Sequence, residues 1–287
     1  MVAKLRKPIK PKRVVILGSG GFISSKLEQI LKLKNIHYLA IKRKDIDLSK
    51  KSSTIKLKKI ITNQDSLVII AAKAPCKNME MLEKNIKIIQ NICISLENKD
   101  INHMLYISSD AVYSDSLKKI NEYSKTDPDN FHGLMHLCRE KIISLISKNN
   151  LCILRPTLIY GKEDPHNGYG PNSFLRLAKK NQPIKLFGKG EELRDHIDVN
   201  DVAKIIYNSL IYKYVGILNL VTGTKISFLE IAQVVIKNTK SSSKILFTKR
   251  TQPMPHNGYR LFNPNLIKKT FKDIKTTSIN KNKLYWQ

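Results

Sequence analysis

The stretch RVVILGSGGFISSKLEQILKL, from Arg13 to Leu33, decides the fold. Its first five residues, RVVIL, form an apolar run after Arg13, which is typical of a strand that is buried on both faces. A glycine turn from Gly18 to Gly21 follows, and residues 23–33 show the periodicity of a helix. The helix N-terminus after such a turn favours a bound phosphate group. A glycine turn without a ligand is the alternative interpretation.

Apolar runs and helical patterns alternate through the first half of the chain. We expect further strands at residues 36–41, 66–72, 103–108 and 151–154, and a helix at residues 79–96. This alternation predicts an α/β fold, with a Rossmann doubly wound parallel sheet.

Beyond residue 160 the sequence becomes rich in Gly, Pro and Asn, which indicates a second lobe. We expect residues 12–160 to form a dinucleotide-binding Rossmann domain. A helix and a strand within residues 195–221 are expected to return the chain to that domain. Residues 161–194 and 222–287 are then expected to form a smaller, interleaved C-terminal α/β lobe that binds the substrate.

Composition narrows the class of protein. The 287 residues carry a formal net charge of +28. The basic residues are spread along the chain, so we expect an attraction for anionic substrates and no nucleic-acid partner. No apolar run is long enough to span a membrane, and the first thirteen residues lack the apolar core of a secretory signal. The four cysteines show neither a CxxC pair nor regular spacing, which predicts free thiols and a cytoplasmic location.

Four motifs occur in order along the chain, from residue 17 to residue 203. They are LGSGGFIS (residues 17–24), SSDAVYS (108–114), LRPTLIYG (154–161) and LFGKGEELRDHIDVNDVA (186–203). They resemble the TGxxGFIG, SSxxVYG, RPxxxYG and FGxGxxxRDxxxVxDxA motifs of the extended short-chain dehydrogenase/reductase family. The first motif departs at Ser24, where a third glycine is common. The resemblance implies an NAD(P)-dependent enzyme that acts on a nucleotide-diphosphate sugar, with a homodimer common among relatives.

The residues after the second strand bear on the choice of cofactor. An NAD site normally has a carboxylate there for the adenosine ribose, but this chain has Lys42, Arg43 and Lys44. Cations suit a 2′-phosphate, so we predict NADP(H) over NAD(H), with Arg43 as the contact. A merely solvated basic edge is the alternative. The full set of expected cofactor contacts is Gly18, Gly20, Gly21, Phe22, Ile23, Arg43, Asp47, Leu48, Ala71, Ala72 and His136.

The resemblance also locates the catalytic groups. In the family a Ser or Thr, a Tyr and a Lys cooperate, and Ser109 holds the hydroxyl position. The segment HGLMHLCRE corresponds to the family's YGxSKxxxE, so His132 and His136 replace the Tyr and the Lys. Residues four apart share one helix face, and an imidazole can exchange protons near neutral pH.

Three interpretations of this histidine pair stay open. The first is altered catalysis by Ser109, His132 and His136. The second is a catalytically degenerate protein that only binds ligands or partners. The third is a metal site formed with Glu140, although no further ligand cluster is evident and we expect no metal.

The substrate side depends on fewer residues. The resemblance places Arg194 where the family contacts a nucleotide-sugar diphosphate, and an ion pair with Asp195 is the alternative role. Asn172 and Arg260 are further expected substrate contacts. Family dehydratases tend to carry Asp and Glu after the hydroxyl residue, whereas here Ala follows the Asp. Epimerisation or carbonyl reduction is therefore favoured over dehydration.

Overall fold

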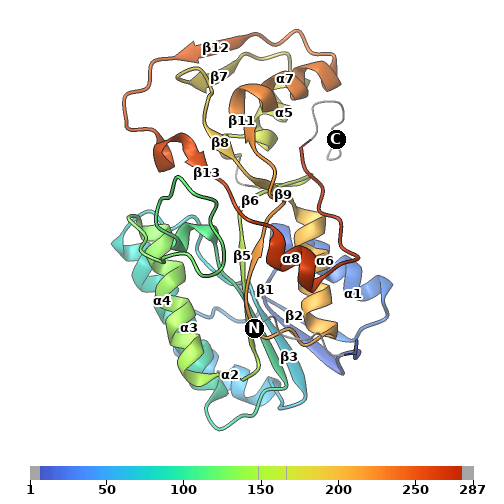
Figure 1. The fold of residues 1–287 in the computed structure, drawn as a ribbon. Coiled ribbons are helices and arrows are strands. Elements are labelled where there is room, and N and C mark those ends of the chain that lie inside the picture. Colours follow the sequence, from blue (N-terminus) through green and yellow to red (C-terminus); the bar gives the residue numbers. More distant parts are fainter. Residues whose placement is uncertain (1–6, 148, 166, 280–287) are drawn as a thin grey trace.

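A computed structural model describes residues 7–147, 149–165 and 167–279, and it shows two lobes (Figure 1). The larger lobe contains a six-stranded sheet in the order β10-β5-β4-β3-β1-β2. All neighbouring strands in it are parallel. The predicted α/β class with a doubly wound sheet is therefore confirmed. The strands are β1 (Arg13–Ser19), β2 (Tyr38–Lys42), β3 (Asp65–Ile69), β4 (His103–Ile107), β5 (Leu151–Pro156) and β10 (Gly216–Leu220).

Helices cover both faces of this sheet, which explains why its strands are apolar on both sides. In Figure 1, α3 and α4 lie on one face, and α1 and α6 lie on the other. Every residue of β3 and β4 is buried. Each fully buried aliphatic side chain contributes about 1.5–3 kcal/mol, so these two faces supply much of the stability. The helices are α1 (Phe22–Leu33), α2 (Ser53–Ile60), α3 (Met79–Leu96), α4 (Phe131–Ile146) and α6 (Val199–Ile211).

The chain leaves the sheet after β5 and returns to it later. β6 (Leu158–Tyr160) pairs with β9 (His196–Asp198), which leads into α6 and then β10. β10 adds to the outer edge of β5, and α6 packs against α1. The two lobes are therefore linked by more than one crossing of the chain.

The smaller lobe is built from short elements around its own apolar core. Phe174, Leu186, Phe228 and Ile231 belong to that core. The last eight residues of the expected substrate lobe lie outside the described residues. The elements of the smaller lobe are α5 (Pro171–Lys179), β7 (Ile184–Phe187), β8 (Leu193–Arg194), β11 (Ile226–Ser227), α7 (Phe228–Thr239), β12 (Ile245–Thr248), the short 3₁₀ turn η2 (Pro255–Gly258) and β13 (Tyr259–Arg260). The 3₁₀ turn η1 (Asp110–Val112) and helix α8 (Asn265–Thr270) pack with the larger lobe, where α8 contacts β10.

No helix within the described ranges has the length and apolar character that crossing a bilayer requires. The longest, α3, exposes Met79 in its first turn, and its other exposed residues are Glu80, Glu83, Lys87 and Gln90. The four cysteines are unpaired, and Cys76, Cys93 and Cys152 among them are buried.

Candidate active site

A cavity of about 680 Å³ opens beside the glycine turn that follows β1. It lies at the carboxyl ends of β1 and β3, where the strand order reverses and where doubly wound sheets bind their ligands. Ten of the eleven expected cofactor contacts line this one cavity: Gly18, Gly20, Gly21, Phe22, Ile23, Arg43, Asp47, Leu48, Ala71 and Ala72. The eleventh, His136, lines the neighbouring cavity described below.

The backbone of the turn fits a dinucleotide pyrophosphate. Gly18 and Gly20 have φ angles of +98° and +88°, which side chains rarely allow. The backbone amides in the first turn of α1, which begins at Phe22, have no carbonyl acceptor within the helix and can donate hydrogen bonds to a bound anion. The Ser24 hydroxyl accepts from the Gly21 amide at 2.9 Å and donates to the Gly21 carbonyl at 3.1 Å. Serine at the third position therefore fits without opening the turn.

A polar cavity of about 390 Å³ adjoins this site at Arg43, Ile46 and Asp47, which line both cavities. Arg43, Lys44, Lys50 and Lys56 line it. Arg43 is 71% exposed and makes only a 3.7 Å contact with Asp47, so its guanidinium is available to a ligand. The buried hydroxyl of Ser53 also lines the cavity and has no hydrogen-bond partner among the described residues.

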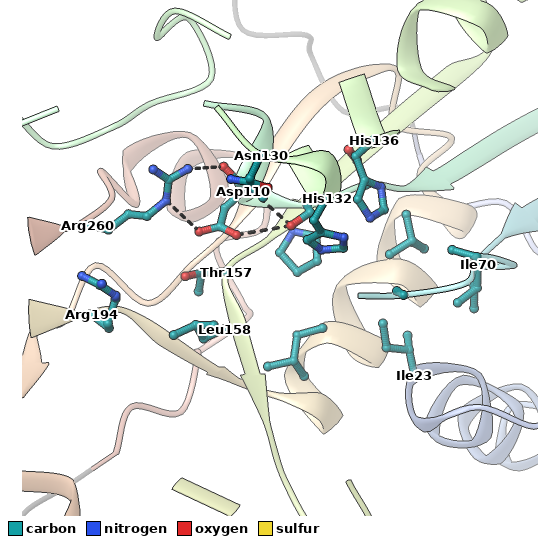
Figure 2. Close-up of a pocket in the computed structure, with 18 of the residues that line it drawn as sticks. Ile23, Ile70, Asp110, Asn130, His132, His136, Thr157, Leu158, Arg194 and Arg260 are labelled. Atoms are coloured by element: carbon teal, nitrogen blue, oxygen red, sulfur yellow. Dashed lines mark hydrogen bonds and ion pairs between the residues drawn. The ribbon is translucent and has the colours of Figure 1, made fainter. Parts of the chain in front are cut away.

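A second cavity of about 450 Å³ continues from the first and contains the expected catalytic groups. The two cavities share Ile23, Ile70, Ala72, Ala74 and Ile159. Figure 2 shows Arg194 and Arg260 at one end of this cavity, Ile23 and Ile70 at the other, and His132 between them. The expected site residues that line it are Ser109, His132, His136, Arg194 and Arg260.

Local structure brings α4 up to the loop that carries Ser109. The Ser109 hydroxyl accepts from the Ala111 amide at 3.2 Å and so begins η1. Asn130 caps α4 by accepting from the amide of Gly133 at 2.9 Å. A Cβ atom at Gly133 would collide with the carbonyl oxygen of Ala111, so only glycine lets α4 approach this closely. His132 is thereby placed in the same cavity as Ser109.

The two imidazoles form a neutral pair. Their ring centroids are 4.8 Å apart, with the planes at 85°. Burial lowers the pKa of His132, against the raising effect of Asp110. Burial also lowers the pKa of His136 well below its ordinary value, with further lowering by His132 and Arg139. Neither ring therefore supplies the permanent positive charge that a lysine would.

Hydrogen bonds tie both imidazoles to neighbouring groups. The amide of Cys76 donates to Nδ1 of His132 over 3.4 Å, and the Tyr106 hydroxyl lies 2.8 Å from Nδ1 of His136. With Nδ1 accepting, neutral His132 carries its hydrogen on Nε2. Accepting a proton at Nε2 requires the other tautomer, which gives up only the long contact with Cys76.

Glu140, on the same helix, points elsewhere. Its carboxylate pairs with buried Arg155 at 2.6 Å and accepts from the Ser108 hydroxyl at 2.5 Å. Among the described residues, no three His, Cys, Asp or Glu side chains are grouped so as to hold a metal ion. In the described part of the chain, Glu140 therefore does not join His132 and His136 in a metal-binding arrangement.

The two arginines of the cavity have different partners. Arg194 pairs with Glu192 at 3.0 Å, whereas Asp195 accepts from the Thr222 hydroxyl at 2.6 Å, so the alternative ion pair between Arg194 and Asp195 is wrong. Arg260 lies 3.2 Å from the carboxylate of Asp110.

Asn172 lies apart from the residues that line the second cavity. Its side chain accepts from the Gly161 amide at 3.2 Å and donates to Asp164 at 3.0 Å. Asp164 lines the cofactor cavity, so Asn172 shapes a loop over that cavity. Its role as a substrate contact stays a prediction, and the geometry gives it no contact with the substrate side.

Several residues of the site were not predicted from sequence. The second cavity is also lined by Asn130, Thr157 and His256. The Tyr106 hydroxyl contacts Nδ1 of His136. An Asn directly before an apolar helical pattern is a recognisable cap signal, so Asn130 could have been found. Thr157 lies at a variable position of the motif LRPTLIYG, so that motif could have drawn attention to it. Tyr106 and His256 depend on contacts between distant segments, and no local pattern marks them.

Comparison with known proteins agrees with this geometry. Residues 14–212 match the model of the NAD dependent epimerase/dehydratase family. A Methanocaldococcus jannaschii protein named "Putative UDP-glucose 4-epimerase" is 31% identical over 152 residues. That match spans 50% of this chain and 50% of the relative, so it covers about half of the length of each.

Solved structures share the fold at low sequence identity. UDP-glucuronic acid 4-epimerase from Bacillus cereus has a TM-score of 0.78 at 19% identity, covering 93% of this chain and 95% of its own. dTDP-4-dehydrorhamnose reductase from Bacillus anthracis has a TM-score of 0.77 at 18% identity, covering 95% and 96%. UDP-glucose 4-epimerase from Thermus thermophilus has a TM-score of 0.74 at 17% identity, covering 90% and 93%. The ordered motifs, the glycine turn beside its cavity and the matched family model together show that this chain belongs to the NAD dependent epimerase/dehydratase family.

Proposed function

We propose that this protein is an NAD(P)-dependent epimerase or reductase that acts on a nucleotide-diphosphate sugar. One observation carries the proposal: the cavity beside the glycine turn is continuous with a cavity that holds a hydroxyl, two imidazoles and two guanidinium groups. A ligand in the first cavity would therefore adjoin a reacting group in the second. A bound nicotinamide dinucleotide supplies hydride transfer to or from a sugar carbon.

The chain's own residues divide the remaining work. Gly18, Gly20 and the first amides of α1 would hold the two phosphates of the cofactor. Ser109 would hydrogen-bond the reacting oxygen of the sugar. His132 would exchange the proton at that oxygen, because its imidazole is neutral and its contact with Cys76 is long.

The substrate diphosphate would lie at the arginine end of the second cavity. Arg194 offers a planar donor set suited to phosphate oxygens. Arg194 is paired with Glu192 and Arg260 with Asp110, so contact of either guanidinium with the substrate would compete with its carboxylate. The absence of a Glu after Asp110 supports epimerisation or reduction over dehydration.

The basic cavity beside Arg43 supports NADP(H) over NAD(H). Four cationic side chains outnumber the two carboxylates of Asp45 and Asp47 there, and the buried Ser53 hydroxyl has no partner among the described residues, which suits a phosphate monoester on the adenosine ribose. Calorimetric titration of both cofactors tests this preference. We expect Arg43→Gln to weaken NADP(H) binding by about tenfold, with little effect on NAD(H). Lys34→Gln, which removes an exposed cation at the end of α1, is the control. Tighter NAD(H) than NADP(H) binding by the wild-type protein would contradict it.

Turnover with a panel of nucleotide sugars tests the proposed reaction. Nicotinamide absorbance reports net reduction, and product NMR reports redox-neutral epimerisation. We expect His132→Ala to lose at least about 100-fold in kcat, whereas His37→Ala, which removes an exposed histidine, should be silent. Full turnover by His132→Ala would remove His132 from the reaction. Cofactor binding without any turnover would favour the degenerate protein.

The cytoplasmic location and the homodimer stay predictions.

A further inference from the structure

A guanidinium group without a carboxylate partner is buried beneath the cofactor cavity. Arg139 on α4 is 0% exposed, and no ion pair to it occurs among the described residues. Its Nη2 donates to the carbonyl of Ala71 at 2.6 Å, and its Nη1 lies 3.5 Å from Oδ1 of Asn85. Nε has no partner within the described part of the chain. Burial of an unpaired charge is costly, so a side chain kept in this state requires an explanation beyond packing.

The guanidinium of Arg139 faces an aromatic ring that leads to the active site. It lies 5.2 Å from the ring centroid of Tyr106, which is itself 1% exposed. The hydroxyl at the other end of that ring is 2.8 Å from Nδ1 of His136. Arg139, Tyr106 and His136 therefore form a continuous series from a fixed cation to an imidazole of the cavity.

The direction of the last hydrogen bond follows from the charges around it. Burial raises the pKa of Tyr106 well above its ordinary value, so the phenol keeps its hydrogen. A cation over the ring withdraws electron density and makes the phenol a better donor than acceptor. His136 is neutral, and its Nδ1 then accepts from Tyr106. The ring hydrogen is left on Nε2, because the hydrogen bond at one imidazole nitrogen determines which nitrogen is protonated.

We propose that Arg139 and Tyr106 are positioning residues that hold His136 as its neutral Nε2–H tautomer beside His132. His136 then serves the cavity as a fixed hydrogen-bond donor. A fixed guanidinium charge then lies on Arg139, one helical turn after His136 in α4. This inference rests on the proposed function only for its catalytic consequence, since the tautomer can be observed without turnover.

Nitrogen NMR of the histidine rings in the ¹⁵N-labelled protein, without cofactor or substrate, tests the proposal. His136→Gln assigns the His136 signals. We expect an unprotonated, hydrogen-bonded Nδ1 and a protonated Nε2 in the wild type. Tyr106→Phe should give a mixture of tautomers. Tyr113→Phe is the matched control, because Tyr113 is also buried under an arginine, at 4.8 Å from Arg155, but donates to Asn219.

Variants of the cation complete the experiment. Arg139→Lys should keep the wild-type tautomer, and Arg139→Met should lose it in part. If Arg139→Met fails to fold by circular dichroism, Tyr106→Phe still decides the question. A protonated Nδ1 in the wild type, or an unchanged His136 spectrum in Tyr106→Phe, would overturn the proposal.

Turnover separates this inference from the proposed function. Tyr106→Phe should lower kcat by about tenfold while cofactor affinity stays unchanged. The expected tautomers in a protein without turnover would contradict the proposed function and support the positioning role. Turnover that is insensitive to Tyr106→Phe and Arg139→Met, with unchanged spectra, would contradict the positioning role and leave the reaction intact.

Discussion

At the scale of single residues, the backbone at Gly18 sets the shape of the cofactor cavity. Its φ of +98° and its contact with Ala71 close the junction between β1 and β3. A Cβ atom at this position would lie 2.5 Å from the amide nitrogen of Ala71. Gly21, three residues later, has an ordinary φ of −98°, and a Cβ atom there would meet the Ser24 hydroxyl at an ordinary contact distance of 3.9 Å. The backbone conformation and the lack of space therefore require glycine at position 18, and neither factor applies at position 21.

Gly18→Ala should lower the free energy of unfolding by at least about 2 kcal/mol, because it combines backbone strain with a backbone clash. Gly21→Ala, the matched control, should cost less than about 1 kcal/mol, although it can weaken cofactor binding. Urea denaturation of both variants measures the difference. Equal stability of the two variants would show that the turn relaxes around the added methyl group.

His196 on β9 is a second residue with an unusual environment. It is 3% exposed, and neither ring nitrogen has a hydrogen-bond partner among the described residues. Burial, aided by Arg194, lowers its pKa from 6.5 to about 3. The unfolded chain therefore binds a proton that the folded state rejects, and stability is lost as pH falls from about 6.5 toward about 3. Asp195, with its pKa raised to about 6, acts in the opposite sense between pH 3.8 and 6.

His196→Phe should be at least as stable as the wild type at about pH 7.5, because an apolar ring replaces unpaired polar atoms. The difference in unfolding free energy between the variant and the wild type should grow by about 2 kcal/mol at about pH 5, because the wild type loses stability by keeping His196 unprotonated. Denaturation with urea at both pH values measures the change. The remaining buried histidines keep some acid sensitivity in the variant, so only the difference between the two proteins is diagnostic. A difference that does not change with pH would show that His196 has a partner.

At the scale of elements, the first turn of α4 positions His132, the residue proposed to exchange a proton with the substrate. Asn130 caps it, and Asn78 caps α3 in the same way, by accepting from the amide of Met81 at 3.0 Å. The two caps have similar geometry, but only α4 carries His132. They allow the stability of a helix to be separated from the placement of a side chain.

Asn130→Ala and Asn78→Ala should each cost about 1 kcal/mol of unfolding free energy. Only Asn130→Ala should also lower kcat/KM, by about tenfold, because His132 follows the loosened turn. Asn130→Asp, which keeps a cap, should restore both quantities. Equal losses of kcat/KM in the two alanine variants would contradict a special role for the cap of α4.

The sequence predicts the elements of the core better than those of the small lobe. α3 has the expected bounds, because its apolar residues repeat at helical spacing over five turns. β3 ends at Ile69, three residues before the expected end, because the amide of Ala71 turns to the carbonyl of Leu17. α5 begins at Pro171, since proline suits a first helical turn. The two-residue strands β8, β11 and β13 exist only through pairing between distant segments, which no local pattern records.

The residues of the site, like the elements, are predictable from sequence where the pattern is local and not where distant segments meet. The glycine turn and the His132/His136 pair are local patterns, and the structure places them in adjoining cavities. Arg139 and Tyr106 lie on different elements and meet only in the fold, so their contact could not be read from either segment. Asp110 and Arg260 are 150 residues apart and meet for the same reason.

At the scale of the whole molecule, the net charge of +28 is the dominant property. Its field extends over about 10 Å at an ionic strength of about 0.1 M and is screened at higher salt. Anionic ligands should be attracted to the site from beyond contact distance. A ligand with more negative charge should gain more.

Raising salt from about 0.05 M to about 0.5 M should weaken NADP(H) binding more than NAD(H) binding, because the 2′-phosphate adds charge. Calorimetry at the two salt concentrations measures both dissociation constants. Equal salt dependence for the two cofactors would show that the basic cavity beside Arg43 does not receive the extra phosphate.

The strand β10 pairs with the edge of β5 but lies far from it in the sequence. This limits how the polypeptide can be divided into fragments. A fragment that stops at residue 160 would contain five strands of the central sheet and would leave β5 with an open hydrogen-bonding edge. Such an edge recruits other chains, so the fragment should aggregate rather than behave as a free-standing nucleotide-binding module. During synthesis, the same edge stays uncovered until the ribosome has translated some sixty residues past Tyr160 (residues 216–220 form the missing strand).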